Sequence, residues 1–170
     1  GHSAFRWPVW WQWKQNGHPK SNMNVLTFAA PAAGNKGFAE SFDKEFPNSL
    51  RFENSNDIVP KFPVSEKVAD LGDLFSPAPS AHSISVGYKN LTTSLKNVFS
   101  LMSGALDILR FNDVSPYKQT NGSGMMITIP LSGKNNSNDA SAWFAEAGYQ
   151  HGVARYAAAL GVPVIDCDTH

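Results

Sequence analysis

The order of apolar and polar positions predicts that strands and helices alternate along this chain. Short apolar runs at residues 24–28 and 49–53 predict two buried strands. The segment between them predicts a helix, which Asn35 can cap at its start and Pro47 ends. Its apolar positions recur at helical spacing, at Phe38, Ala39, Phe42 and Phe46. A strand, a helix and a strand in this order imply a parallel sheet with the helix packed on one face.

The rest of the chain extends this pattern. Residues 64–89 are rich in proline and serine and predict a loop, whereas residues 91–109 have the clearest helical spacing of apolar side chains. We expect that helix to pack on the core. Residues 125–129 predict the last strand, and further helices are predicted at 140–147 and 153–160. The predicted fold class is therefore α/β, with a mainly parallel sheet and flanking helices.

Length and charge limit what the protein can do. With 170 residues the chain is long enough for a single domain with a hydrophobic core. Its 14 lysines and arginines balance its 14 aspartates and glutamates, so neither nucleic acid nor an anionic membrane is expected as an electrostatic partner. Only 16% of the residues are charged, which suits an apolar substrate, a lost partner surface or a poorly soluble fragment. A single cysteine excludes an internal disulfide, and no apolar run reaches the length of about 18 residues that a membrane-spanning helix needs.

Two motifs beside the predicted strands carry the candidate chemistry. Residues 27–35 have the sequence Thr-Phe-Ala-Ala-Pro-Ala-Ala-Gly-Asn, and residues 54–63 have the sequence Asn-Ser-Asn-Asp-Ile-Val-Pro-Lys-Phe-Pro. An aspartate just past a strand, on a turn made rigid by prolines, is well placed to orient a histidine. In order and spacing the two motifs resemble those of the class 3 (fungal-type) lipases, a family of α/β-hydrolases. The resemblance implies a partial α/β-hydrolase fold in which Asp57 is the acid of a Ser-Asp-His triad.

The start of the chain resembles the nucleophile motif of the same family. Residues 1–3 are Gly-His-Ser, and the family has Gly-His-Ser-x-Gly-Gly around its nucleophilic serine. The resemblance therefore implies that Ser3 is the nucleophile, which precedes Asp57 in the order Ser, Asp, His that α/β-hydrolases follow. The backbone N–H of the next residue, Ala4, would then be one donor of the oxyanion hole.

The residues after Ser3 depart from the family motif. Phe5 and Arg6 stand where the family has glycines, although a nucleophile elbow needs small residues so that its strand and helix can approach each other. Two interpretations follow: an active enzyme with a divergent elbow, or a catalytically impaired remnant that only packs or binds. Because the chain begins at the nucleophile motif, we interpret residues 1–170 as a single, incomplete α/β-hydrolase domain.

A triad also needs a histidine, and the chain has five. His151 follows the predicted last strand and precedes the predicted last helix, and its surroundings resemble, more loosely, the family's C-terminal His-x-x-x-Tyr region. We expect it in a loop at a helix N-terminus, whose positive end would favour the neutral form that acts as a base. His82 is the alternative, although no strand separates it from Asp57. The remaining three fit less well: His2 beside the candidate nucleophile, His18 ahead of Asp57, and His170 at the end of the chain.

The function that the resemblance implies is hydrolysis of acylglycerols or similar carboxylic esters. Ser3 would attack the carbonyl carbon, His151 would move the proton, and Asp57 would orient His151. Without the resemblance, a structural histidine and a turn-stabilising aspartate are the simpler alternatives for the last two residues.

The expected partner is a lipid or a small ester, with neither a cofactor nor a metal. The sequence has no zinc or calcium motif, and Asp166 and Asp168 are more typical of a solvated tail than of a metal site. The apolar face of the helix at 91–109 is also suited to lie beside an acyl chain or a lipid–water interface. Secretion would agree with the family, but compartment, oligomeric state and acyl-chain length stay open.

Overall fold

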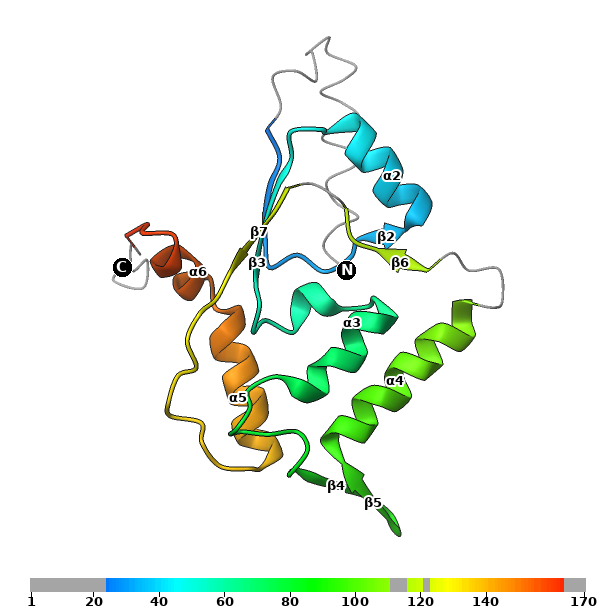
Figure 1. Cartoon of the computed structure of the whole chain (residues 1–170), viewed down its shortest axis with the longest axis vertical. Coiled ribbons are helices and arrows are strands. Elements are labelled where there is room, and N and C mark those ends of the chain that lie inside the picture. The colour runs from blue at the N-terminus through cyan, green and yellow to red at the C-terminus, as the bar shows by residue number, and fades with distance from the viewer. Residues whose placement is uncertain (1–23, 111–115, 121–122, 164–170) are drawn as a thin grey trace, which may run out of the picture.

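The computed structural model describes residues 24–110, 116–120 and 123–163 and is shown in Figure 1. The order strand, helix, strand that the apolar pattern predicts for residues 24–53 is present in β1, α2 and β3, with the short strand β2 before the helix. In chain order the elements are β1 (Leu26–Phe28), β2 (Gly34–Asn35), α2 (Lys36–Glu45), β3 (Leu50–Asn54), η3 (Val59–Lys61), α3 (Ser65–Ala69), η4 (Asp70–Asp73), β4 (Ser85–Tyr88), β5 (Leu91–Ser94), α4 (Leu95–Arg110), β6 (Tyr117–Lys118), β7 (Ser123–Ile127), α5 (Ala140–His151) and α6 (Val153–Ala159).

The central sheet has three strands in the order β1-β3-β7, and both neighbouring pairs are parallel. Phe28, Phe52 and Met125 lie side by side across it, and the rings of the two phenylalanines stack with their centroids 5.0 Å apart. The predicted parallel sheet with flanking helices is confirmed. Because all three strands run the same way, their carboxyl ends meet at one edge, and β3 leads from that edge directly to Asp57.

The helix between β1 and β3 begins where the sequence predicts. The side chain of Asn35 accepts a 3.0 Å hydrogen bond from the backbone N–H of Phe38, so Asn35 caps α2. A Cβ atom on Gly34 would lie 2.7 Å from the side chain of Phe38. Glycine is therefore required here because a helix side chain packs directly over the backbone.

The segment predicted as a loop at residues 64–89 contains α3, η4 and β4. β4 pairs with β5 in an antiparallel hairpin, so Leu91 belongs to a strand and α4 begins only at Leu95. The loop prediction was wrong because helices of one or two turns are too short to show a period. The predicted start of α4 was wrong because pairing with β4 overrides the helical spacing of Leu91.

The main hydrophobic core lies between α3, α4 and α5, below the sheet in Figure 1. Trp143 of α5 is fully buried at its centre, and its ring centroid lies 5.2 Å from that of Phe75 and 5.1 Å from that of Phe99. One face of α4 thus packs on the core, as predicted. On its other face Leu101 and Ile108 are 71% and 66% exposed.

The two C-terminal helices have clear boundary residues. The side chain of Asp139 accepts a 2.9 Å hydrogen bond from the N–H of Ala142 and so caps α5. Gly161 adopts a positive φ of 71° just past α6, which is the predicted end of that helix. Among the described residues, no helix is long and apolar enough to cross a membrane.

Candidate active site

Asp57 lies on a tight turn at the carboxyl edge of the sheet. Its backbone N–H donates to the carbonyl oxygen of Asn54 at 2.9 Å, which folds the chain back as soon as β3 ends. Its Oδ1 accepts a 2.9 Å hydrogen bond from the N–H of Val59, and Pro60 fixes the backbone at the start of η3. The Asp57 side chain is fully buried. The motif of Asn, Asp, Val and Pro thus places a carboxylate at the edge of the sheet.

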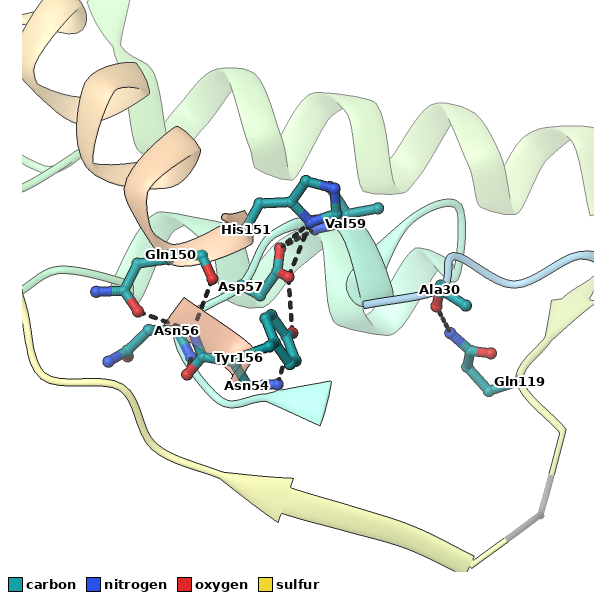
Figure 2. A network of polar contacts seen from close by, with 9 residues as sticks. All are labelled: Ala30, Asn54, Asn56, Asp57, Val59, Gln119, Gln150, His151 and Tyr156. Atoms are coloured by element: carbon teal, nitrogen blue, oxygen red, sulfur yellow. Dashed lines mark hydrogen bonds and ion pairs between the residues drawn. The ribbon is translucent and has the colours of Figure 1, made fainter. Parts of the chain in front are cut away.

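His151 contacts this carboxylate through one ring nitrogen. Its Nδ1 lies 2.9 Å from Oδ2 and 3.2 Å from Oδ1 of Asp57, as Figure 2 shows. The imidazole is 43% exposed, whereas the carboxylate has no exposed surface. Contact through Nδ1 leaves Nε2, across the ring, for a second partner. This is the arrangement in which a histidine accepts a proton from a hydroxyl while a carboxylate holds its tautomer.

Tyr156 of α6 completes the surroundings of the carboxylate. Its buried hydroxyl donates to Oδ2 of Asp57 at 2.8 Å and accepts a 2.9 Å hydrogen bond from the backbone N–H of Asn54. Burial raises the pKa of Tyr156 well above its usual value, and the charge of Asp57 acts in the same direction, so the hydroxyl remains a donor.

The buried charge of Asp57 is stabilised by hydrogen bonds rather than by a cation. Its donors are the N–H of Val59, the O–H of Tyr156 and the imidazole of His151. Within the described ranges, no lysine or arginine forms an ion pair with it. Charge-assisted hydrogen bonds of this kind offset the cost of burying a carboxylate.

The position of His151 in its helix differs from the prediction. The structure places it as the last residue of α5, and Gly152 separates it from α6. The predicted break before it does not occur, and Gly148 lies inside α5. His151 is therefore not in a loop, but it precedes Gly152, the N-cap of α6, by one residue and so lies next to a helix N-terminus as predicted. Contact with Asp57, and not a helix end, orients the ring.

The alternative histidine has a different partner. Nε2 of His82 lies 2.8 Å from Oδ1 of Asp73, which also accepts a 2.8 Å hydrogen bond from Lys96 on the exposed surface. These hydrogen bonds, that from Lys96 first, lower the pKa of Asp73. The structure thus brings His151, and not His82, to Asp57.

Several residues of the sequence prediction lie outside the described ranges. They include the candidate nucleophile Ser3 and the candidate oxyanion donor Ala4, whose roles stay predictions. Among the described residues, no group of three or more His, Cys, Asp or Glu side chains could hold a metal. Seven further residues named in the sequence analysis also lie outside the described ranges: His2, Phe5, Arg6, His18, Asp166, Asp168 and His170.

A cavity of about 400 Å³ lies elsewhere in the fold. Four basic residues line it, and neither Asp57 nor His151 does; the other lining residues are Val64, Glu66, Pro116, Tyr117, Gln119 and Thr120. Arg51 points into this region but is paired with Glu53 at 2.8 Å. The candidate site at Asp57 and His151 is therefore separate from this cavity. The basic residues are Lys36, Arg51, Lys67 and Lys118.

Sequence comparison agrees with the motif at Asp57. Residues 10–67 match the model of the family described as Lipase (class 3), and this range includes the turn that carries Asp57. The resemblance to class 3 lipases is confirmed. No curated protein matches the chain.

Structural comparison agrees with the fold. The crystal structure of M37 lipase superposes on this chain with a TM-score of 0.57 and 22% sequence identity. The match covers 81% of this chain and 35% of that one, so the chain spans about a third of the length of the lipase structure. The chain therefore adopts a partial α/β-hydrolase fold.

Proposed function

We propose that this chain is part of a carboxylic ester hydrolase that works like the class 3 triacylglycerol lipases. The observation that carries the proposal is the contact between the buried carboxylate of Asp57 and Nδ1 of His151. These residues stand at the carboxyl edge of a parallel sheet, in the order that an α/β-hydrolase triad requires. The match of residues 10–67 to the lipase family supports the same reading.

In the proposed first step, Ser3 attacks the carbonyl carbon of an ester. A serine hydroxyl is a weak nucleophile, so a base must take its proton, and Nε2 of His151 is the nitrogen available for this. The carbonyl oxygen becomes an oxyanion, to which the N–H of Ala4 donates one hydrogen bond. When the tetrahedral intermediate collapses, the C–O bond of the ester breaks and the alcohol leaves with the proton from His151.

In the proposed second step, water replaces the alcohol. His151 removes a proton from water, the hydroxide attacks the acyl-serine, and the carboxylic acid leaves while Ser3 regains its proton. Asp57 keeps the remaining proton of the imidazole on Nδ1, so that the lone pair of Nε2 faces the reaction. It also stabilises the imidazolium that forms in each step.

The proposed substrate is an acylglycerol or another apolar ester. The chain has a formal charge of zero and few charged residues, which suits a substrate of this class. Leu101 and Ile108 of α4 expose apolar surface. Contact of this face with a lipid–water interface is part of the proposal.

Covalent labelling tests the proposal without requiring turnover. The 170-residue chain is incubated with a fluorophosphonate, which reacts with activated serines, and the modified residue is located by mass spectrometry. We expect slow labelling at Ser3, which is lost in Ser3→Ala and strongly reduced in His151→Ala. Labelling that is unchanged in Ser3→Ala would rule out this nucleophile.

Hydrolysis of short-chain nitrophenyl esters tests the activity itself. We expect the chain alone to turn over weakly or not at all, because Phe5 and Arg6 stand where the family motif has glycines and because the chain spans about a third of the lipase structure. Turnover at a normal enzymatic rate of about 10 per second that Ser3→Ala abolishes would favour an intact lipase. The absence of both labelling and turnover would favour the impaired remnant.

A further inference from the structure

Asn54 joins the segments that carry the candidate site. It is the last residue of β3 and is only 2% exposed. Its backbone carbonyl accepts from the N–H of Asp57 at 2.9 Å, and its backbone N–H donates to the hydroxyl of Tyr156 at 2.9 Å. Its backbone therefore contacts both the candidate acid and the tyrosine that binds that acid.

The side chain of Asn54 uses both of its polar atoms. Oδ1 accepts hydrogen bonds from the N–H groups of Ile129, past the end of β7, and Asn56 at 3.1 and 3.2 Å. Nδ2 donates to the backbone oxygen of Gln150 at 3.1 Å and to its Oε1 at 2.8 Å, as Figure 2 shows. One carboxamide thus ties the ends of two strands to the end of α5.

The contact with Gln150 acts at the residue next to His151. The last carbonyl groups of a helix have no partner within the helix and need another donor. Asn54 supplies that donor to the carbonyl of Gln150, so it caps α5 one residue before the candidate base. The hydrogen bonds that fix this last turn of α5 therefore also fix the position from which the His151 side chain extends.

A second buried network holds Gln150 in the orientation that Asn54 needs. Nε2 of Gln150 donates to the carbonyl of Pro130 at 3.1 Å and to Oε1 of Glu146 at 2.9 Å, so its Oε1 faces Asn54. Glu146 in turn accepts from the N–H of Ser132 at 2.9 Å. Although burial alone would raise the pKa of Glu146, hydrogen bonds lower it, so it remains an anionic acceptor.

We propose that Asn54 is a positioning residue that sets the contact between Asp57 and His151. This inference rests on the proposed function, because the contact matters for catalysis only if the pair belongs to a triad. A carboxamide is required at this place: it must donate towards Gln150 and accept from the two strand ends. A carboxylate of the same shape would present an oxygen to the two oxygens of Gln150.

The test follows the tautomer of His151 by ¹⁵N NMR of the imidazole over a pH series. Asn54→Asp keeps the shape of the side chain and removes its donor, and Asn54→Ala removes the side chain without adding charge. In the unsubstituted protein we expect the neutral imidazole of His151 to carry its proton on Nδ1. In both variants we expect the ratio of the Nδ1–H to the Nε2–H tautomer to fall about tenfold, the effect of losing one or two net hydrogen bonds.

Asn56→Ala is the matched control. Asn56 also contacts the segment after β7, through a 2.9 Å hydrogen bond from its Nδ2 to the carbonyl of Ile129, but among the described residues it has no hydrogen bond to α5 or α6. We expect it to lower the melting temperature and leave the tautomer ratio of His151 unchanged. If the Asn54 variants lower the melting temperature and also leave this ratio unchanged, Asn54 is only structural and the inference is wrong.

A second variant keeps the test decisive if Asn54 cannot be replaced. Gln150→Met removes the side-chain amide that faces Asn54 and keeps the length of the side chain. It should shift the tautomer ratio in the same direction, and an unchanged ratio would overturn the inference. The NMR signal needs no nucleophile, so a failure to label Ser3 together with the expected tautomer shifts would reject the proposed function alone.

Discussion

The hydroxyl of Tyr156 donates to Oδ2 of Asp57 at 2.8 Å, the same oxygen that Nδ1 of His151 approaches to 2.9 Å. One carboxylate oxygen is therefore held from two helices, α5 and α6, that are far from Asp57 in the sequence. The other oxygen, Oδ1, is held mainly by the nearby N–H of Val59. Local and distant contacts together leave the carboxylate little freedom to rotate.

Replacement of Tyr156 by phenylalanine should destabilise the protein by about 1–3 kcal/mol. The change removes a donor to Asp57 and leaves the buried N–H of Asn54 without its acceptor. Urea denaturation followed by circular dichroism gives the free energy of unfolding. Tyr149→Phe is the control, because the hydroxyl of Tyr149 has no hydrogen bond within the described ranges, and its effect should stay below about 0.5 kcal/mol. Equal losses in the two variants would contradict the assigned role of the Tyr156 hydroxyl.

Replacement of Asp57 by asparagine should reduce the labelling rate of Ser3 by a factor on the order of 10⁴, as loss of the orienting carboxylate does in comparable triads. The neutral amide does not fix the proton of His151 on Nδ1, and it does not stabilise the imidazolium that forms in the reaction. The rate is measured with the fluorophosphonate by time-resolved mass spectrometry. Asp73→Asn removes the carboxylate that pairs with His82 on the surface and should leave the rate unchanged. A large effect of Asp73→Asn would indicate that His82, and not His151, acts as the base.

Asp139, which caps the start of α5, should make the stability of the protein depend on pH in the acidic range. Hydrogen bonds from Ser137, Ser141 and the backbone, that of Ser137 first, lower the pKa of Asp139 from 3.8 to about 2. Because the folded-state pKa lies below the unfolded one, the stabilisation is fully present above about pH 4 and is lost as the pH falls through about 2. Thermal denaturation between pH 1.5 and 7 measures it. Asp139→Asn, which keeps a capping oxygen but does not titrate, should lack this component of the pH dependence.

Replacement of Trp143 by alanine should cost about 3–5 kcal/mol, because it empties the centre of the core between Phe75 and Phe99. A loss of this size is comparable with the whole stability of a small domain. The next residue offers the control: Phe144 is 55% exposed, and Phe144→Ala should have a small effect. Urea denaturation compares the two. Similar losses would show that Trp143 is not the centre of the core.

The sequence by itself determined the elements that depend on nearby residues. The parallel arrangement of β1 and β3 follows from a strand, a helix and a strand in succession, and the start of α2 follows from the side chain of Asn35. The turn at Asp57 follows from Asx and proline preferences over a few positions. Patterns of this kind are visible in one sequence because the interacting groups are neighbours in the chain.

Only the tertiary structure decided which distant groups meet. The hydrogen bond between Asn54 and Tyr156 spans 102 positions, and that between Asp57 and His151 spans 94. The sequence predicted the second pair through a family resemblance whose motifs include Asn54 and a tyrosine after His151, but nothing in those motifs showed that Asn54, Gln150 and Tyr156 support the pair. The helix predicted to end at residue 147, just before Gly148, instead continues to His151, because Trp143 and Ala147 are buried on the core. Long-range packing and hydrogen bonds leave no periodic trace in a sequence, because each depends on the fold of every segment between the partners.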